Sequence, residues 1–320
     1  MNNENSDSKE PDQNNYQIVP TMSPNKAAIL GLIAVFFIFQ FGGGLLALSV
    51  FGFDLNNADM NLMRLLTIGS QILFILFPAI LFSKLVFVDV TSIIRFKMPQ
   101  PKEVGLFAFG LIILVPLLQD YLNIQNFILS ELSNKFPFVE GIKNFLDMLD
   151  KMVEESYLQL LTANNVIEYF IVIFAVSITP AVCEEIFFRG FVQKSFEFKQ
   201  KPITAIFLTS IFFGLYHFNP YGLLPLIVLG MYLGFSVYKS NSIVVPIILH
   251  FLNNFIALIA FFIFGEEELM QSKFSDVENI STHLITFSIL LAVFIGFIIF
   301  IGKNYNKLTK TEVYNDMSEL

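Results

Sequence analysis

The chain has 320 residues, of which 55% are hydrophobic and only 14% charged, with a net charge of −8 and a mean hydropathy of +0.66. Soluble domains carry about 25% charged residues, so this composition excludes an ordinary water-soluble enzyme, a disordered chain and a nucleic-acid-binding protein. Cys183 is the single cysteine, which excludes a disulfide framework and a cysteine-based zinc ribbon. The sequence therefore predicts an all-α fold, a polytopic membrane helix bundle, with no nucleic acid among its partners.

Residues 1–25 are polar and rich in Asn, Asp, Ser and Glu, so we expect a disordered N-terminal tail with no cleavable signal peptide. Residues 26–302 form the predicted transmembrane domain, and residues 303–320 a cytoplasmic C-terminal tail. A spanning helix needs roughly 20 apolar residues. About eight transmembrane helices are predicted, over residues 27–51, 67–87, 104–122, 166–188, 203–218, 223–237, 243–264 and 284–301.

Two connections carry structural signals. The stretch Asn219-Pro220-Tyr221-Gly222 is a tight-turn signal, which predicts that helices 203–218 and 223–237 form a hairpin. The longest connection, 123–165, has apolar residues at helical spacing with acidic residues between them. This pattern predicts an amphipathic helix on the membrane surface or capping the bundle, with a plain solvent loop as the alternative.

The distribution of Lys and Arg indicates the orientation, because cytoplasmic loops carry the excess of positive charge. A cytoplasmic N-terminus places most of the 19 basic residues inside and puts only Arg64, Lys135, Lys143, Lys151 and Lys273 outside. Both termini are therefore predicted to be cytoplasmic, and the acidic loop Glu266-Glu267-Glu268 to lie outside. The acidic, Asn-rich tail favours a bacterial plasma membrane.

Ionisable residues inside a helix bundle are costly and usually mark function. Glu184 and Glu185 are adjacent in the helix predicted over 166–188, and Arg189 follows Glu185 by four residues, on the same helical face. Arg189 is therefore predicted to neutralise Glu185, while Glu184, rotated by about 100°, points into the bundle and is free to titrate. The purely structural alternative is an ion pair near a helix end with a snorkelling glutamate.

Two further motifs place imidazoles in apolar spans. Phe213 precedes His217 by four residues in helix 203–218, and His250 precedes Asn254 by four residues in helix 243–264. A lone buried histidine is more often a helix–helix hydrogen bonder than a catalyst, but two histidines together with a paired glutamate favour a site. Hydropathy alone places His217 nearer the outside than Glu184, so the two meet only if helix 203–218 is tilted, broken or not fully spanning. The third histidine, His283, is predicted to be interfacial and without a role.

In this order, the motifs Glu184-Glu185…Arg189, Phe213…His217 and His250…Asn254 resemble the CPBP family of intramembrane proteases (CAAX protease and bacteriocin-processing, also called Abi). Residues 166–264 are the catalytic core that the resemblance predicts. The resemblance implies an intramembrane endopeptidase of the CAAX-processing type. It implies that Glu184 and His217 activate water, that His250 and Asn254 bind the oxyanion, and that Glu185, Arg189 and Phe213 support the site.

The residue types suit this chemistry independently of the family. Burial raises the pKa of a glutamate toward the range of a useful general base, and a His N–H with an Asn amide offers two oxyanion donors, each worth about 3–4 kcal/mol in a dry site. No serine triad and no His-Glu-x-x-His motif is visible in the sequence. The expected partners are membrane lipid and a peptide or protein substrate that enters from the membrane; the oligomeric state is not indicated.

Several alternatives remain open at this point. No cofactor is required by the predicted mechanism, but Glu184, His217 and His250 could instead be ligands of a catalytic Zn²⁺ with an open position for water. Cys183 is a competing nucleophile, although buried cysteines are usually inert. The chain could also be a non-catalytic membrane scaffold or bacteriocin immunity protein, or a transporter with a Glu/His proton relay.

Overall fold

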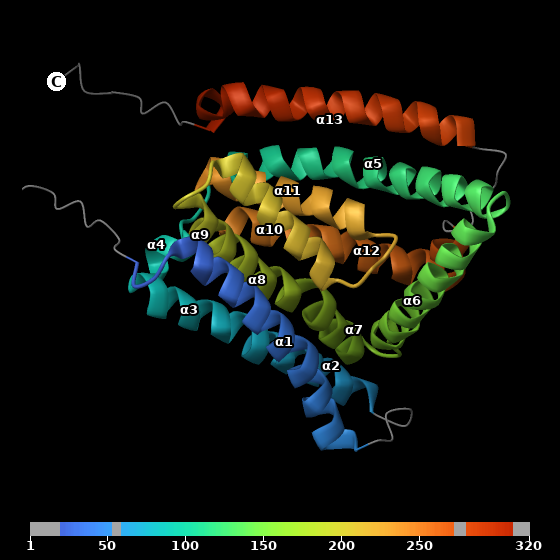
Figure 1. Cartoon of the computed structure of the whole chain (residues 1–320), viewed down its shortest axis with the longest axis horizontal. Coiled ribbons are helices and arrows are strands. Elements are labelled where there is room, and N and C mark those ends of the chain that lie inside the picture. Colours follow the sequence, from blue (N-terminus) through green and yellow to red (C-terminus); the bar gives the residue numbers. More distant parts are fainter. Residues whose placement is uncertain (1–19, 53–58, 272–279, 310–320) are drawn as a thin grey trace, which may run out of the picture.

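The structure is a computed structural model that describes residues 20–52, 59–271 and 280–309. Within these ranges the regular elements are all helices, and seven of them are long and apolar enough to cross a membrane. One further apolar helix, Pro202–Tyr216, is shorter. The predicted all-α polytopic membrane bundle is confirmed (Figure 1). Residues 1–19 and 310–320, which make up most of the two predicted tails, lie outside the described residues.

The first half of the chain forms α1 (Pro24–Phe51), α2 (Met60–Gln71), α3 (Phe77–Phe87), α4 (Val90–Ile94), α5 (Pro101–Ser133) and α6 (Pro137–Leu161). The second half forms α7 (Val166–Ile173), α8 (Thr179–Glu185), α9 (Gln193–Glu197), α10 (Pro202–Tyr216), α11 (Leu223–Ser240), α12 (Val244–Gln271) and α13 (Ile280–Thr309). Three π-helical segments, η2 (Ile72–Leu76), η3 (Phe174–Ile178) and η4 (Ile186–Val192), join α2 to α3 and α7 through α9 into continuous spans. Proline stands in the first turn of α1, α5, α6 and α10, where its fixed φ suits the helix and its missing N–H costs nothing.

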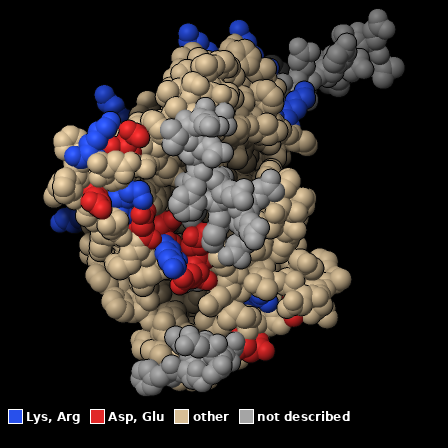
Figure 2. All heavy atoms as spheres, turned by 90° about the vertical axis from the view of Figure 1, so that its right-hand side faces the viewer, with Lys and Arg blue, Asp and Glu red and all other residues tan. Residues whose placement is uncertain are grey.

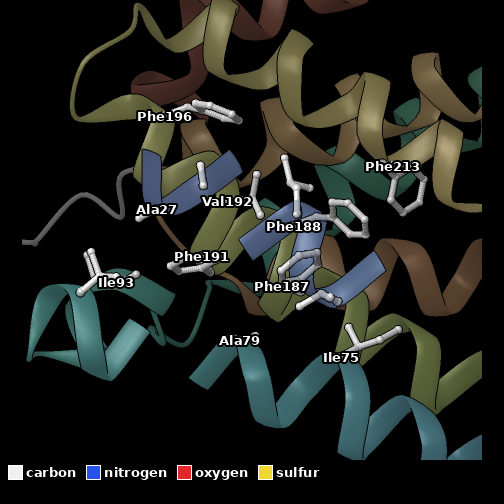
Figure 3. Packing of buried hydrophobic residues seen from close by; sticks show 14 of the residues in the cluster. Ala27, Ile75, Ala79, Ile93, Phe187, Phe188, Phe191, Val192, Phe196 and Phe213 are labelled. Atoms are coloured by element: carbon white, nitrogen blue, oxygen red, sulfur yellow. The ribbon is translucent and has the colours of Figure 1, made fainter. Parts of the chain in front are cut away.

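Phenylalanine side chains fill the core between α1, α3 and the span of α8, η4 and α9 (Figure 3). Phe187, Phe188 and Phe191 are almost completely buried there, against the small residues Ala27 and Ala79 of α1 and α3. Large rings facing small residues let helices approach closely without leaving cavities. This packing holds the helix that carries Glu184 and Glu185 at the centre of the bundle.

The second core lies where α5 packs side by side with α13 and against α11 and α12 (Figure 1). His283, which is predicted to be interfacial, contacts this core near the start of α13, where its Nδ1 lies 2.7 Å from Asp120 Oδ1 of α5. Thr286 donates a hydrogen bond to the other oxygen of the same carboxylate. His283 therefore links α13 to α5 through a polar contact that spans 163 positions of sequence.

One end of the bundle, here called the basic end, is where α3, α9, α11 and α13 finish and where α5, α10 and α12 begin. Lys84, Arg95, Lys97, Lys102, Lys194, Lys199, Lys201, Lys239, Lys303 and Lys307 lie at or beside these helix termini. The opposite end is crossed obliquely by α6 and is here called the α6 end (Figure 1). The predicted acidic loop at Glu266 belongs in its backbone to α12, beyond a kink at Gly265, and its side chains lie outside the described residues.

The α6 end is shaped by α5, by α6 and by the hairpin of α10 and α11. The span predicted over 104–122 continues to Ser133, because α5 has no helix breaker before Asn134 other than Pro116, which the helix tolerates. The amphipathic helix predicted within 123–165 is confirmed as α6. The hairpin of α10 and α11 is also present, and α10, with 15 residues, reaches only about 22 Å from the basic end.

We expect Gly110→Ala to lower the thermal stability of the detergent-solubilised protein. A Cβ at Gly110 would overlap the Tyr232 hydroxyl and approach the Phe297 ring to 2.5 Å, which would force α5 away from α11 and α13. Gly105→Ala, on the same helix but with no described atom within 4 Å of the place its Cβ would take, is the matched control. It should keep or slightly raise the melting temperature, because alanine is the better helix former. Equal effects of the two substitutions would contradict this packing.

Candidate active site

The two adjacent glutamates lie where the helix from Val166 to Glu197 departs from regular α-helical geometry. Glu184 and Glu185 end α8, with the π-helical turn η3 before that helix and η4 directly after it. Single π-helical turns inside α-helices frequently accompany functional sites, because they re-aim side chains without ending the helix. Here they leave the two carboxylates pointing to different sets of partners.

Glu185 is fully buried and is held by two cationic or hydrogen-bonding partners. Arg189 Nη1 lies 3.0 Å from Glu185 Oε1, and both side chains are 0% exposed. His250 Nδ1 lies 2.8 Å from the same oxygen. Arg189 also donates from Nη2 to the Gly230 carbonyl at 3.2 Å and lies over the Phe213 ring, with its Cζ 4.3 Å from the centroid. The predicted pairing of Glu185 with Arg189 is present, and Glu185 fixes His250 as well.

Glu184 faces His217. The Oε2 atom of Glu184 lies 3.8 Å from His217 Nε2, and this buried oxygen has no hydrogen-bond partner among the described residues. The other ring nitrogen, Nδ1, is 2.7 Å from the Phe213 carbonyl, to which it donates, so Nε2 is the nitrogen turned toward the carboxylate. The side chains of Glu184 and His217 are 16% and 28% exposed. They are the part of the site that solvent can enter.

The depth conflict expected from hydropathy is resolved by the length of α10. His217 directly follows Tyr216, the last residue of α10, and therefore lies at the tip of the α10–α11 hairpin. Because this hairpin stops partway along the bundle, its tip is level with the middle of the long helix that carries Glu184. Phe218 adopts a left-handed φ of 49° and Asn219 Oδ1 accepts a hydrogen bond from Gly222 N, which together close the turn.

Phe213 packs between the two histidines, with its ring centroid 4.7 Å from that of His217 and 5.8 Å from that of His250. Asn254, one turn beyond His250 on α12, donates from Nδ2 to the Val176 carbonyl in η3 at 3.2 Å, and Asn253 donates to its Oδ1. The structure thus joins Glu184 to His217 and joins Glu185 to Arg189 and His250. The Phe213 ring lies between these two sets of residues, and Asn254 of α12 lies one helical turn beyond His250.

Three contacts at this site carried no signal in the sequence. They are the bond from His250 to Glu185, the bond from Asn254 to Val176, and the approach of α6 to the tip of the α10–α11 hairpin. The phenolic hydroxyl of Tyr221, at the hairpin tip, donates to Asp147 of α6, and Gln125 of α5 donates to the Tyr221 carbonyl at 3.1 Å. Hydropathy and helical spacing describe single helices, so neither could show these contacts between helices.

The site residues do not assemble a metal centre in this arrangement. Among the described residues, no three side chains of His, Cys, Asp or Glu come together as ligands of one ion. The alternative ligand set of Glu184, His217 and His250 is divided, since His250 is engaged with Glu185. Cys183 is 1% exposed and packs in the apolar core.

Comparison with known proteins gives a match to a protein family. Residues 166–256 match the family model described as type II CAAX prenyl endopeptidase Rce1-like, a segment that runs from α7 into α12 and contains all three motifs. The predicted resemblance to the CPBP family is confirmed. The match supports an intramembrane protease in general. No curated protein and no solved structure matches the chain.

We expect Glu185→Gln to destabilise the fold rather than only the chemistry. Removing the carboxylate charge leaves the Arg189 guanidinium buried without its counter-ion, which costs about 3–5 kcal/mol. Unfolding in detergent, followed by circular dichroism, should show a large loss of stability. Glu184→Gln should retain near-native stability, because Glu184 has no such ion pair with Arg189; equal losses would contradict the division of roles between the two acids.

Proposed function

We propose that this chain is an intramembrane endopeptidase of the CAAX-processing type that hydrolyses a peptide bond with a water molecule activated by Glu184 and His217. The observation that carries the proposal is the pair formed by the unsatisfied Glu184 oxygen and His217 Nε2, 3.8 Å apart in the partly exposed part of the site. A water molecule between them can hydrogen-bond to both. The family match over residues 166–256 supports the same reaction class.

These contacts indicate which group donates and which group accepts each proton in the reaction. His217 donates from Nδ1 to the Phe213 carbonyl, so its Nε2 lone pair accepts a hydrogen bond from the attacking water. Glu184 takes the other water proton as the oxygen attacks the carbonyl carbon. The new C–O bond gives a tetrahedral intermediate, and Glu184 returns the proton to the leaving amine as the C–N bond breaks. No cofactor is required for these steps.

His250 and Asn254 are assigned to the oxyanion. The Glu185 carboxylate accepts the Nδ1–H of His250 and so fixes the orientation of the ring, and His250 acts on the oxyanion through Nε2 when that nitrogen carries a proton. Asn254 uses one amide N–H on Val176 and retains the second. Two donors held by packing and hydrogen bonds need no reorganisation when charge develops, and each is worth about 3–4 kcal/mol in such sites. Glu185, Arg189 and Phe213 are positioning residues in this scheme.

We expect Glu184→Gln to abolish cleavage, with a loss of at least about 100-fold, because an amide cannot accept the proton of the attacking water. The measurement is a proteomic comparison of membranes from cells that express the wild type or the variant, in which uncleaved precursors should accumulate only with the variant. Glu155→Gln on the exposed side of α6 is the matched control and should process normally. Normal processing by a folded Glu184→Gln protein would instead favour the scaffold or immunity alternative.

Chelation separates the metal-free mechanism from the zinc alternative. We expect the purified protein to keep its cleavage activity after treatment with a strong chelator and dialysis, because no ligand set is assembled around Glu184 in the part of the chain that the structure describes. Activity is measured on a precursor identified in the proteomic comparison. Loss of cleavage that added Zn²⁺ restores would show that Glu184, His217 and His250 rearrange around a metal ion.

A further inference from the structure

The two ends of the bundle differ in how they close over the site. The segment of α12 from Val244 to Gly265 has 22 residues, or about 33 Å, whereas α10 has 15 residues, or about 22 Å, and both start at the basic end. The hairpin of α10 and α11 therefore stops short of the longer helices around it, as Figure 1 shows. His217 stands at the tip of this hairpin, on the side of the α6 end.

On the side of the basic end, the interior below Glu184 is sealed. Glu185, Arg189 and Gln193 are all 0% exposed, and Gln193 donates to the Gly234 carbonyl at 3.1 Å. A Cβ at Gly234 would lie 2.7 Å from the Gln193 side chain, so the two helices meet with no space between them. Arg95 and Glu197 form an ion pair further toward the same end. A peptide chain cannot reach Glu184 by this route.

The helix α6 presents its polar face to the interior of the α6 end. Asp147 accepts the Tyr221 hydroxyl from the hairpin tip, and Asp150, Glu154 and Tyr157 follow on the same face at helical spacing. The opposite face carries exposed apolar side chains, with Phe138 79%, Phe145 56% and Met152 61% exposed. A helix that covered a dry core would be turned the other way, so the side of α6 that meets the hairpin tip is polar.

Tyr157 connects this face of α6 to the catalytic acid. Its side chain is about half exposed, yet desolvation by the surrounding protein raises its pKa, and the charge of Glu184 raises the pKa further. The electrostatic effect of Glu184 on Tyr157 indicates that the face of α6 that carries Tyr157 is turned toward the catalytic acid. Figure 2, which views the molecule from this side, shows acidic side chains gathered near the centre of this face.

We infer that the scissile peptide reaches Glu184 from the α6 end, which the Lys and Arg distribution places on the extracytoplasmic side, so that the substrate is an exported or membrane-inserted polypeptide. The described Lys and Arg residues concentrate at the basic end, which marks it as cytoplasmic. Arg64 is a basic residue of the α6 end, and its guanidinium donates hydrogen bonds to the carbonyls of Leu160 and Thr162. The inference rests on the proposed function and adds the side of the membrane from which the substrate reaches the site.

Cysteine accessibility tests the inference. The test uses two variants, Tyr157→Cys and Tyr238→Cys. Tyr238 lies beside Lys239 and Lys303 at the basic end. Each variant is treated with a small, cationic, membrane-impermeant methanethiosulfonate, both in right-side-out and in inverted membrane vesicles. The two tyrosines are 53% and 42% exposed, and the native Cys183 is 1% exposed, so the wild type gives the background. We expect Tyr157→Cys to react only in right-side-out vesicles and Tyr238→Cys only in inverted ones. Modification of Tyr157→Cys should also abolish cleavage, whereas modification of Tyr238→Cys should not.

Each outcome decides a separate part of the inference. Reaction of Tyr157→Cys only in inverted vesicles would overturn the extracytoplasmic assignment. A block of cleavage by modification at Tyr238→Cys and none at Tyr157→Cys would overturn the access route. Asp150→Cys, on the same face of α6, replaces Tyr157→Cys if that variant does not accumulate. Labelling needs no proteolysis, so failure of the proposed function, seen as identical precursor profiles for wild type and Glu184→Gln, is distinguishable from either result.

Discussion

The site depends on how one negative charge is neutralised where no water reaches it. The carboxylate of Glu185 is completely buried in an apolar bundle, and a charge in such surroundings costs several kcal/mol unless it is paired. Arg189 on the same helix and His250 on α12 supply that pairing. Because the partners come from two helices, the ion pair also ties α12 to the span of α8 and η4. The register of the catalytic helices is therefore set by electrostatics as well as by packing.

This arrangement divides two adjacent and chemically identical side chains by environment. Glu185 is completely buried and is held by Arg189 and His250, whereas Glu184 lies beside His217 and its side chain is 16% exposed. The carboxylate of Glu185 is therefore occupied by its ion pair, whereas that of Glu184 is placed where it can meet a water molecule. Phe213 separates the two environments, since its ring packs against both imidazoles and under the Arg189 guanidinium.

Helical periodicity was enough to predict the contacts made within one helix. It placed Arg189 on the face of Glu185, and composition placed all these residues in a membrane bundle. The bond between Glu185 and His250 spans 65 positions of sequence, and the link between Asp120 and His283 spans 163, so neither has a local signature. Hydropathy gave the length of helix 203–218 but not the depth of its tip within the bundle. That depth depends on where this helix begins relative to its neighbours. The amphipathic pattern of α6 was clear, but a pattern cannot show which face meets water.

The orientation of α6 connects the fold to the reaction. The proposed hydrolysis requires water at Glu184, while the buried ion pair of Glu185 and Arg189 requires water to be excluded, and the two positions are only about one helical turn apart. The short hairpin and the inward polar face of α6 admit water from one end, and the bulky phenylalanines with the close approach at Gly234 exclude it from the other. Under the proposed mechanism, a site built this way is reached from a single side of the membrane.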